Sequence, residues 1–186
     1  TAERSSQRVR SVFITINAYA QKTGKGEEVL LDESDGYAIV ARKAGTLHPL
    51  FVGDKVNWKG SNLPRRTKWY TTLDTLRKMA HSYLPEAAPS ITSTWEPQFK
   101  GQVPIRPEEL DIEHAKDEFF ILLDRLRSLP VFVGLESGDN LDDVRLFPSD
   151  FDSEEDRKKC KGHLLLRPVG QSNVAAAVGQ LVHKGQ

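Results

Sequence analysis

The sequence has one cysteine and no long apolar run. A single cysteine excludes an internal disulfide framework and any thiolate metal cluster built within one chain. No apolar stretch approaches the roughly 18 residues that a membrane-spanning helix needs, and the N-terminus lacks the basic-then-apolar layout of a signal peptide. These absences predict a cytoplasmic protein without a membrane partner.

An excess of charge of one sign is also missing, because 26 lysines and arginines balance 26 aspartates and glutamates. No global field therefore attracts nucleic acid or an acidic membrane, and any site for a polyanion must be a local patch. The chain has no internal repeats and no heptads, which excludes solenoids and coiled coils. Its length of 186 residues favours one domain.

The chain starts at Thr1 without an initiator methionine and leads directly into a patterned segment, as a piece of a longer protein would. Apolar residues at Val9, Val12, Phe13 and Ile16 have helical spacing and predict a helix that ends near position 17. The same stretch also alternates over 11–16, as a strand does, so both interpretations stay open. Residues 21–26 contain two glycines and predict a basic loop.

The apolar spacing of the rest of the chain predicts a mainly α fold, a helical domain with at most a small β element; an α+β fold is the alternative. A short helix is expected from Glu27, and the next helix should be capped by Asp35 and ended by Gly45. The alternation over Lys55–Trp58 predicts a short strand.

Three further helical regions follow. Thr71-Thr72-Leu73-Asp74 resembles a capping box and predicts a helix that Pro85 stops. Its core stripe is Leu73, Leu76, Ala80 and Tyr83, with Leu84 adjacent. The strongest helix prediction covers 107–129, with one apolar face formed by Ile112, Ala115, Phe119, Leu122 and Leu126 and widened by Phe120 and Leu123.

The last element, 162–184, should be two helical pieces broken near Arg167-Pro168, with Leu164, Leu165, Leu166, Val174, Val178, Leu181 and Val182 as its apolar residues. Residues 85–107, which are rich in proline, and 138–155, which are acidic and rich in turn formers, are predicted to be long surface loops. Trp95 and Phe99 are expected to fix the first loop to the core.

Several short segments resemble, in order, the region downstream of the DGQHR motif in bacterial DGQHR/DndB-like proteins. They are Val12-Phe13-Ile14-Thr15-Ile16-Asn17, Lys22-Thr23, Leu30-Leu31-Asp32-Glu33 with Asp35, Ala41-Arg42, Val56-Asn57-Trp58-Lys59, Thr71-Thr72-Leu73 with Leu76-Arg77, and His163-Leu164-Leu165-Leu166-Arg167-Pro168-Val169-Gly170-Gln171. The resemblance spans most of the chain.

Members of that family accompany systems that place phosphorothioates or modified bases in DNA, and some are regarded as DNA-binding regulators. The resemblance implies that 1–186 is a single C-terminal helical domain of a longer member, active in DNA modification or phage defence. The DGQHR stretch is absent, so no catalytic residue can be carried over. We therefore expect a non-catalytic DNA-binding or regulatory domain with double-stranded DNA or other proteins of such a system as partners. A nuclease or ATPase completed by an upstream half and a helical protein–protein interaction module are the alternatives.

One cluster of basic and aromatic residues carries the DNA-binding hypothesis. It consists of Lys55, Trp58, Lys59, Arg65, Arg66, Lys68 and Trp69, followed by Tyr70. Cations of this kind meet phosphates, and the rings can stack on bases. The alternative is that the tryptophans are partly buried while the cations only solvate a loop.

Other candidate sites are weaker, and the sequence predicts no metal and no cofactor. Lys22, Gly24, Lys25 and Gly26 at a helix start could hold an anion, but a P-loop needs a glycine and a hydroxyl residue where Tyr19 and Gly26 stand. Asp111, His114 and Glu118 share a helix face that could bind a metal or move a proton, yet their charged neighbours favour a solvated surface.

Three single residues remain open at this point. Cys160 among lysines would be an activated thiol if exposed, although an incidental surface cysteine is the simpler interpretation. Asn17 and Arg42 could face a missing upstream domain; a helix cap and a surface ion pair are the alternatives.

Overall fold

The computed structural model describes residues 24–95, 105–150, 153–159 and 162–185. Its α-helices are α2 (Lys25–Leu31), α3 (Gly36–Leu47), α4 (Leu73–Ala87), α5 (Pro89–Thr92), α6 (Glu109–Arg127), α7 (Pro130–Glu136), α8 (Leu141–Arg145), α9 (Glu154–Lys159) and α10 (Pro168–Gly185). Short 3-10 turns cover Pro49–Phe51, Pro148–Asp150 and Leu164–Leu166. Within the described ranges the only strands are β1 (Val56–Asn57) and β2 (Thr71–Thr72), so the predicted mainly α fold with a small β element is confirmed.

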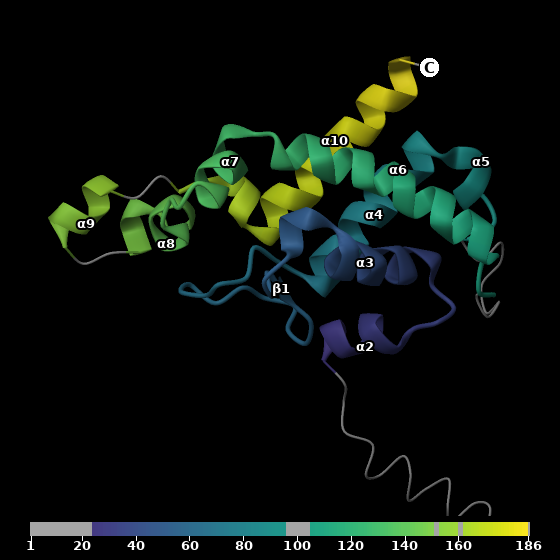
Figure 1. Cartoon of the computed structure of the whole chain (residues 1–186), viewed down its shortest axis with the longest axis horizontal. Helices are drawn as coiled ribbons and strands as arrows, with labels where there is room; N and C mark the ends of the chain where they lie inside the picture. Colours follow the sequence, from purple (N-terminus) through teal and green to yellow (C-terminus); the bar gives the residue numbers. More distant parts are fainter. Residues whose placement is uncertain (1–23, 96–104, 151–152, 160–161, 186) are drawn as a thin grey trace, which may run out of the picture.

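Helix α4 lies at the centre of the fold and packs against α10, α3 and α6 (Figure 1). The predicted stripe of α4 is buried in full: Leu73, Leu76, Ala80, Tyr83 and Leu84. Gly179 lets α10 approach closely, because a Cβ at this position would lie 3.2 Å from the carbonyl oxygen of Ser82. The absence of a side chain at Gly179 thus brings the two backbones together.

The predicted cap at Asp35 is confirmed, and the next helix is capped by Thr72, one residue after the start of the predicted capping box. The Asp35 carboxylate accepts the backbone N–H of Ala38 at 3.1 Å, and the hydroxyl of Thr72 accepts that of Thr75 at 3.0 Å. Each cap satisfies a donor that the first helical turn leaves without an intrahelical partner.

The strongest helix prediction is also confirmed. Helix α6 runs from Glu109 to Arg127 and buries Ile112, Ala115, Phe119, Leu122, Leu123 and Leu126. Phe120 at the edge of this face is half-buried and makes an edge contact with the ring of His48 at 4.9 Å. The predicted end near 129 agrees with the structure, where Pro130 begins the separate helix α7.

Two predicted helix ends are wrong. Helix α3 continues past Gly45 to Leu47, because Gly45 faces the core: a Cβ there would lie 3.0 Å from the Trp58 ring. Helix α4 continues past Pro85 to Ala87. A proline in the last turn removes one backbone donor, while the N–H of Ala88 still reaches the carbonyl of Leu84 at 2.8 Å.

The two predicted long loops are shorter than expected. In 85–107, the end of α4 and helix α5 take up the first residues, and Trp95 is buried edge-on to Tyr37 with ring centroids 5.1 Å apart. This confirms the expected role of Trp95, whereas Phe99 lies outside the described residues. In 138–155, helix α8 forms because Val144 and Leu146 supply enough apolar surface to bury in an otherwise acidic stretch.

The chain's two ends give different outcomes. The helix or strand expected over 9–17 lies outside the described residues. At the other end, the 3-10 turn Leu164–Leu166 and α10 are separated at Arg167, which confirms the predicted break. Leu164 and Leu181, which were assigned to the apolar stripe, are exposed. No helix in the described part of the chain is long and apolar enough to cross a bilayer.

His48 is a buried histidine whose protonation should be coupled to folding. Its side chain is 1% exposed, its Nδ1 accepts the N–H of Leu50 at 3.2 Å, and Asp124 lies 3.2 Å from Nε2. Burial lowers the pKa of His48 from 6.5, and the nearby Asp124 offsets only part of this shift.

We expect this burial to cost stability as the pH falls. The unfolded chain takes up the proton near pH 6.5, whereas the folded chain resists it, so the free energy of unfolding should fall below that pH. Urea unfolding between about pH 7.5 and 5 measures this. In His48→Asn the free energy of unfolding should depend less on pH over this range. If the variant shows the same pH dependence as the parent protein, His48 is not the group responsible.

Candidate nucleic-acid interface

The predicted basic cluster lies on the connection between the two strands. Strands β1 and β2 pair in parallel, with Val56 opposite Thr71 and Asn57 opposite Thr72. Parallel neighbours need a long return connection, and residues 58–70 provide it as an irregular loop. We call residues 59–69 the basic loop.

Side chains at both ends give the basic loop its shape. Asn57 is buried beneath the start of the loop, where its Oδ1 accepts the N–H groups of Lys59 and Gly60 at 3.3 and 3.1 Å. Its Nδ2 donates to the carbonyl of Asn62 at 3.3 Å. At the other end the Thr67 hydroxyl accepts the N–H of Trp69 at 3.4 Å. The loop is therefore held by local hydrogen bonds and is not an open tether.

Arg145 of α8 holds the end of the loop from inside the protein. Its side chain is 1% exposed and donates to three backbone carbonyls: Thr67 at 3.1 Å, Leu166 at 3.2 Å, and Trp69. Burial is the main cause of the lowered pKa of Arg145, which falls to about 10. A fully buried cation bonded to carbonyl oxygens is a structural anchor for the residues that it contacts.

Gln171 of α10 extends the same support by a few residues. Its Nε2 donates to the carbonyls of Tyr70 and Leu165 at 2.9 and 2.8 Å, and its Oε1 accepts the Thr71 hydroxyl at 2.7 Å. Together with Arg145 it fixes residues 67–71 to the C-terminal part of the chain. The side chains of Arg145 and Gln171 thus provide hydrogen-bond partners for buried polar groups around the start of β2.

The cations of the basic loop lie at the surface. Lys59, Arg65, Arg66 and Lys68 are all exposed, which both interpretations of the cluster expect. Two of them contact acidic residues: the Lys68 ammonium lies 2.5 Å from the Asp54 carboxylate, and Arg65 Nε lies 3.5 Å from Asp150. No ion pair is recorded within the described ranges for Lys59 or Arg66.

The aromatic members of the cluster are less available than the cations. Trp58 is partly buried against the core beside Gly45, and Trp69 is also partly covered. Tyr70 is buried, and the Lys55 ammonium lies 4.7 Å from its ring centroid. The cluster therefore divides into a supporting set, Lys55, Trp58, Trp69 and Tyr70, and an exposed set, Lys59, Arg65, Arg66 and Lys68.

One acidic residue enters this basic region. Asp150 Oδ2 accepts the backbone N–H of Phe147 and the guanidinium of Arg167, both at 3.0 Å, while Oδ1 faces Arg65. The N–H of Phe147 and the guanidinium of Arg167 hold the pKa of Asp150 below its ordinary value. Arg167 also lies over the Phe147 ring, 4.9 Å from its centroid.

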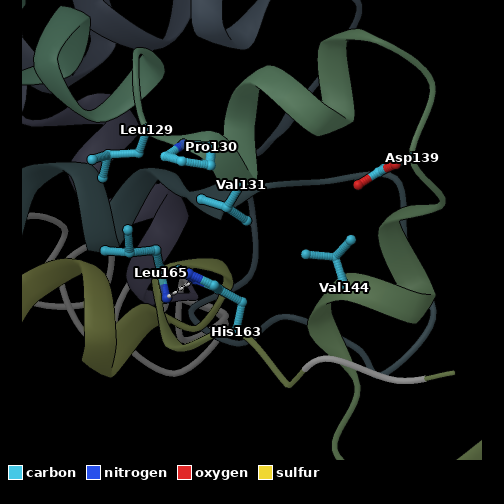
Figure 2. A pocket seen from close by; sticks show the side chains of 7 residues that line it. All are labelled: Leu129, Pro130, Val131, Asp139, Val144, His163 and Leu165. Atoms are coloured by element: carbon cyan, nitrogen blue, oxygen red, sulfur yellow. Dashed lines mark hydrogen bonds between the residues drawn. The ribbon is translucent and has the colours of Figure 1, made fainter. Parts of the chain in front are cut away.

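A pocket of about 330 Å³ opens beside this region (Figure 2). Its walls are mostly apolar and come from the start of α7, from the α8 region and from the turn before α10. The lining residues are Leu129, Pro130, Val131, Asp139, Val144, His163 and Leu165. His163 Nδ1 accepts the N–H of Leu165 at 3.3 Å, so in the neutral ring the proton is on Nε2.

The glycines near the start of α2 have a packing role. A Cβ at Gly26 would lie 2.6 Å from the Lys59 carbonyl oxygen, and the N–H of Gly24 is taken by Glu27 at 3.1 Å. The backbone of the basic loop therefore occupies the space beside this helix start, and these glycines allow the contact. Lys22 lies outside the described residues.

The residues of the helical metal or acid–base candidate have separate surroundings. Glu118 accepts the hydroxyl of Tyr83 at 2.8 Å, while His114 is exposed. Across the described residues no three histidine, cysteine, aspartate or glutamate side chains form a group that could hold a metal ion.

Of the remaining candidates, only Arg42 can be placed. It donates to the carbonyls of Val29 and Asp32 at 2.8 and 2.7 Å and pairs with Glu33, so it joins α3 to α2. Cys160 and Asn17 lie outside the described residues.

Sequence reasoning missed the two residues that support the basic loop. Gln171 stands just after the predicted break at Arg167-Pro168, and nothing in its local pattern indicates a contact with position 70. Arg145 stands in an acidic, turn-rich stretch where an exposed arginine is the ordinary expectation.

No protein-family description, curated protein or solved structure matches this chain.

Proposed function

We propose that this chain is a non-catalytic domain that binds double-stranded DNA through the phosphates, with the basic loop as its contact surface. The observation that carries the proposal is the exposure of Lys59, Arg65, Arg66 and Lys68 on one internally supported loop. The resemblance to DGQHR/DndB-like proteins supports the same function, as a DNA-binding or regulatory part of a DNA-modification or defence system.

The support beneath the loop strengthens the proposal. A loop that is already ordered loses little conformational entropy when it binds, so its cations contribute more of their attraction to affinity. Phosphate contacts of this kind position a protein on DNA without reading its sequence. The half-buried rings of Trp58 and Trp69 favour such backbone contacts over stacking on splayed bases.

The proposal predicts a salt-dependent loss when the two adjacent arginines are removed. Arg65→Ala with Arg66→Ala should weaken binding to a short duplex about tenfold, and the slope of log affinity against log salt should shrink by about 2. Fluorescence anisotropy with a labelled duplex between about 50 and 200 mM salt measures both quantities.

A matched control removes two cations elsewhere. Arg125 on α6 and Lys184 at the end of α10 are exposed, and neither has a recorded ion pair in the described part of the chain. Arg125→Ala with Lys184→Ala changes the net charge equally and should leave the slope unchanged. If both double variants lose affinity equally, the attraction is a property of total charge and the basic loop is not the interface.

A further inference from the structure

Two guanidinium groups meet the carboxylate of Asp150 where the basic loop approaches the C-terminal part of the chain. Arg65 and Arg167 both face the Asp150 carboxylate, at 3.5 and 3.0 Å. Arg145 lies close behind, since Arg167 donates to its backbone carbonyl at 3.5 Å. Among the described side chains, two arginines therefore share the carboxylate of Asp150 at this point.

We propose that Arg65 and Arg167 form a subsite for one backbone phosphate of DNA and that the Asp150 carboxylate occupies it when DNA is absent. The inference rests on the proposed function and adds to it a competing group within the chain. A carboxylate offers a guanidinium two oxygens in nearly the arrangement of the two non-bridging oxygens of a phosphodiester. The present partner of the arginines therefore indicates the kind of ligand that they bind.

The contacts of Asp150 differ in how readily they can exchange. The side chain of Arg65 is 72% exposed and only one of its nitrogens approaches the carboxylate, so a phosphate can take its place at little cost in stability. Arg167 is 29% exposed and its Nε is buried without a hydrogen-bond partner among the described residues.

The two carboxylate oxygens of Asp150 have different partners, so one substitution can remove the contact with Arg65 and keep the contacts of Oδ2. In Asp150→Asn, an amide oxygen at the Oδ2 position can still accept the N–H of Phe147 and the guanidinium of Arg167. The amide nitrogen then faces Arg65 and cannot pair with it. This substitution releases Arg65 while it preserves the local turn.

The test measures duplex affinity and its salt slope for Asp150→Asn. We expect about threefold tighter binding and a slope steeper by about 1, as for one added phosphate contact. Glu109→Gln is the control, because it neutralises another carboxylate paired with an arginine, Arg106 at 3.1 Å, at the start of α6. It should change neither quantity. Adding Arg65→Ala to Asp150→Asn should abolish the gain.

The outcomes separate this inference from the proposed function. Unchanged or weaker binding by Asp150→Asn, in a protein that still depends on Arg65 and Arg66, would overturn the inference alone and make Asp150 an orienting group for the arginines. A gain that persists after Arg65→Ala would also overturn it. Binding that ignores the Arg65 and Arg66 substitutions would overturn both.

Discussion

Replacing Arg145 with methionine should lower the free energy of unfolding by about 2–4 kcal/mol. The substitution leaves the carbonyls of Thr67, Trp69 and Leu166 buried without a donor, and each unsatisfied group costs about 1–3 kcal/mol. Part of this loss is returned, because burial of the cation is itself unfavourable, as the lowered pKa of about 10 indicates. The free-energy cost of leaving three buried carbonyls without donors is larger than this gain.

Urea unfolding followed by circular dichroism measures this loss, and limited trypsin digestion shows where it acts. Because Arg145 holds residues 67 and 69, the variant should be cleaved faster after Arg65, Arg66 and Lys68 than the parent protein. Arg145→Lys keeps the charge but loses the fork of donors, so it should give an intermediate result. A methionine variant as stable as the parent would show that the three hydrogen bonds contribute nothing.

Truncating Phe119 to alanine should cost about 3–5 kcal/mol. Phe119 is fully buried on α6, within the core that α6 shares with α3 and α4. The loss has two parts, the transfer of the ring's apolar surface and the cavity that the surrounding helices cannot close. A small domain has only about 5–15 kcal/mol of stability, so this single change removes a large share of it.

The same helix provides the control for Phe119→Ala. Ile121 lies two residues after Phe119 on α6 and is 51% exposed. Ile121→Ala should therefore change the free energy of unfolding, measured by urea unfolding, by less than about 0.5 kcal/mol. If both substitutions lower the free energy of unfolding equally, α6 does not contact the core through the face that carries Phe119.

The sequence predicted those parts of the fold that local chemistry determines. The apolar periodicity of α4 and α6 and the cap at Asp35 arise within a few residues, and all three are confirmed. Gly45 was mistaken for a helix end because the reason for a glycine there is the ring of Trp58, thirteen positions further along the chain. That contact belongs to tertiary packing.

The sequence predicted the exposure of the residues of the candidate site but not their tertiary contacts. The exposure of Arg65, Arg66 and Lys68 follows from residue type, since such side chains are seldom buried. Their surroundings do not follow: Arg65 meets Asp150 only after the fold has formed, and local patterns contain no information on that distance. The buried state of Arg145 was unpredictable for the same reason.

The support of the basic loop also sets the order in which a growing chain can complete it. The side-chain hydrogen bonds that Arg145 and Gln171 make to residues 67–71 span separations of 76 to 101 residues. A ribosome adds residues one at a time, so a nascent chain that already contains the loop still lacks these donors. We therefore expect the loop to reach its final shape only after Gln171 has emerged.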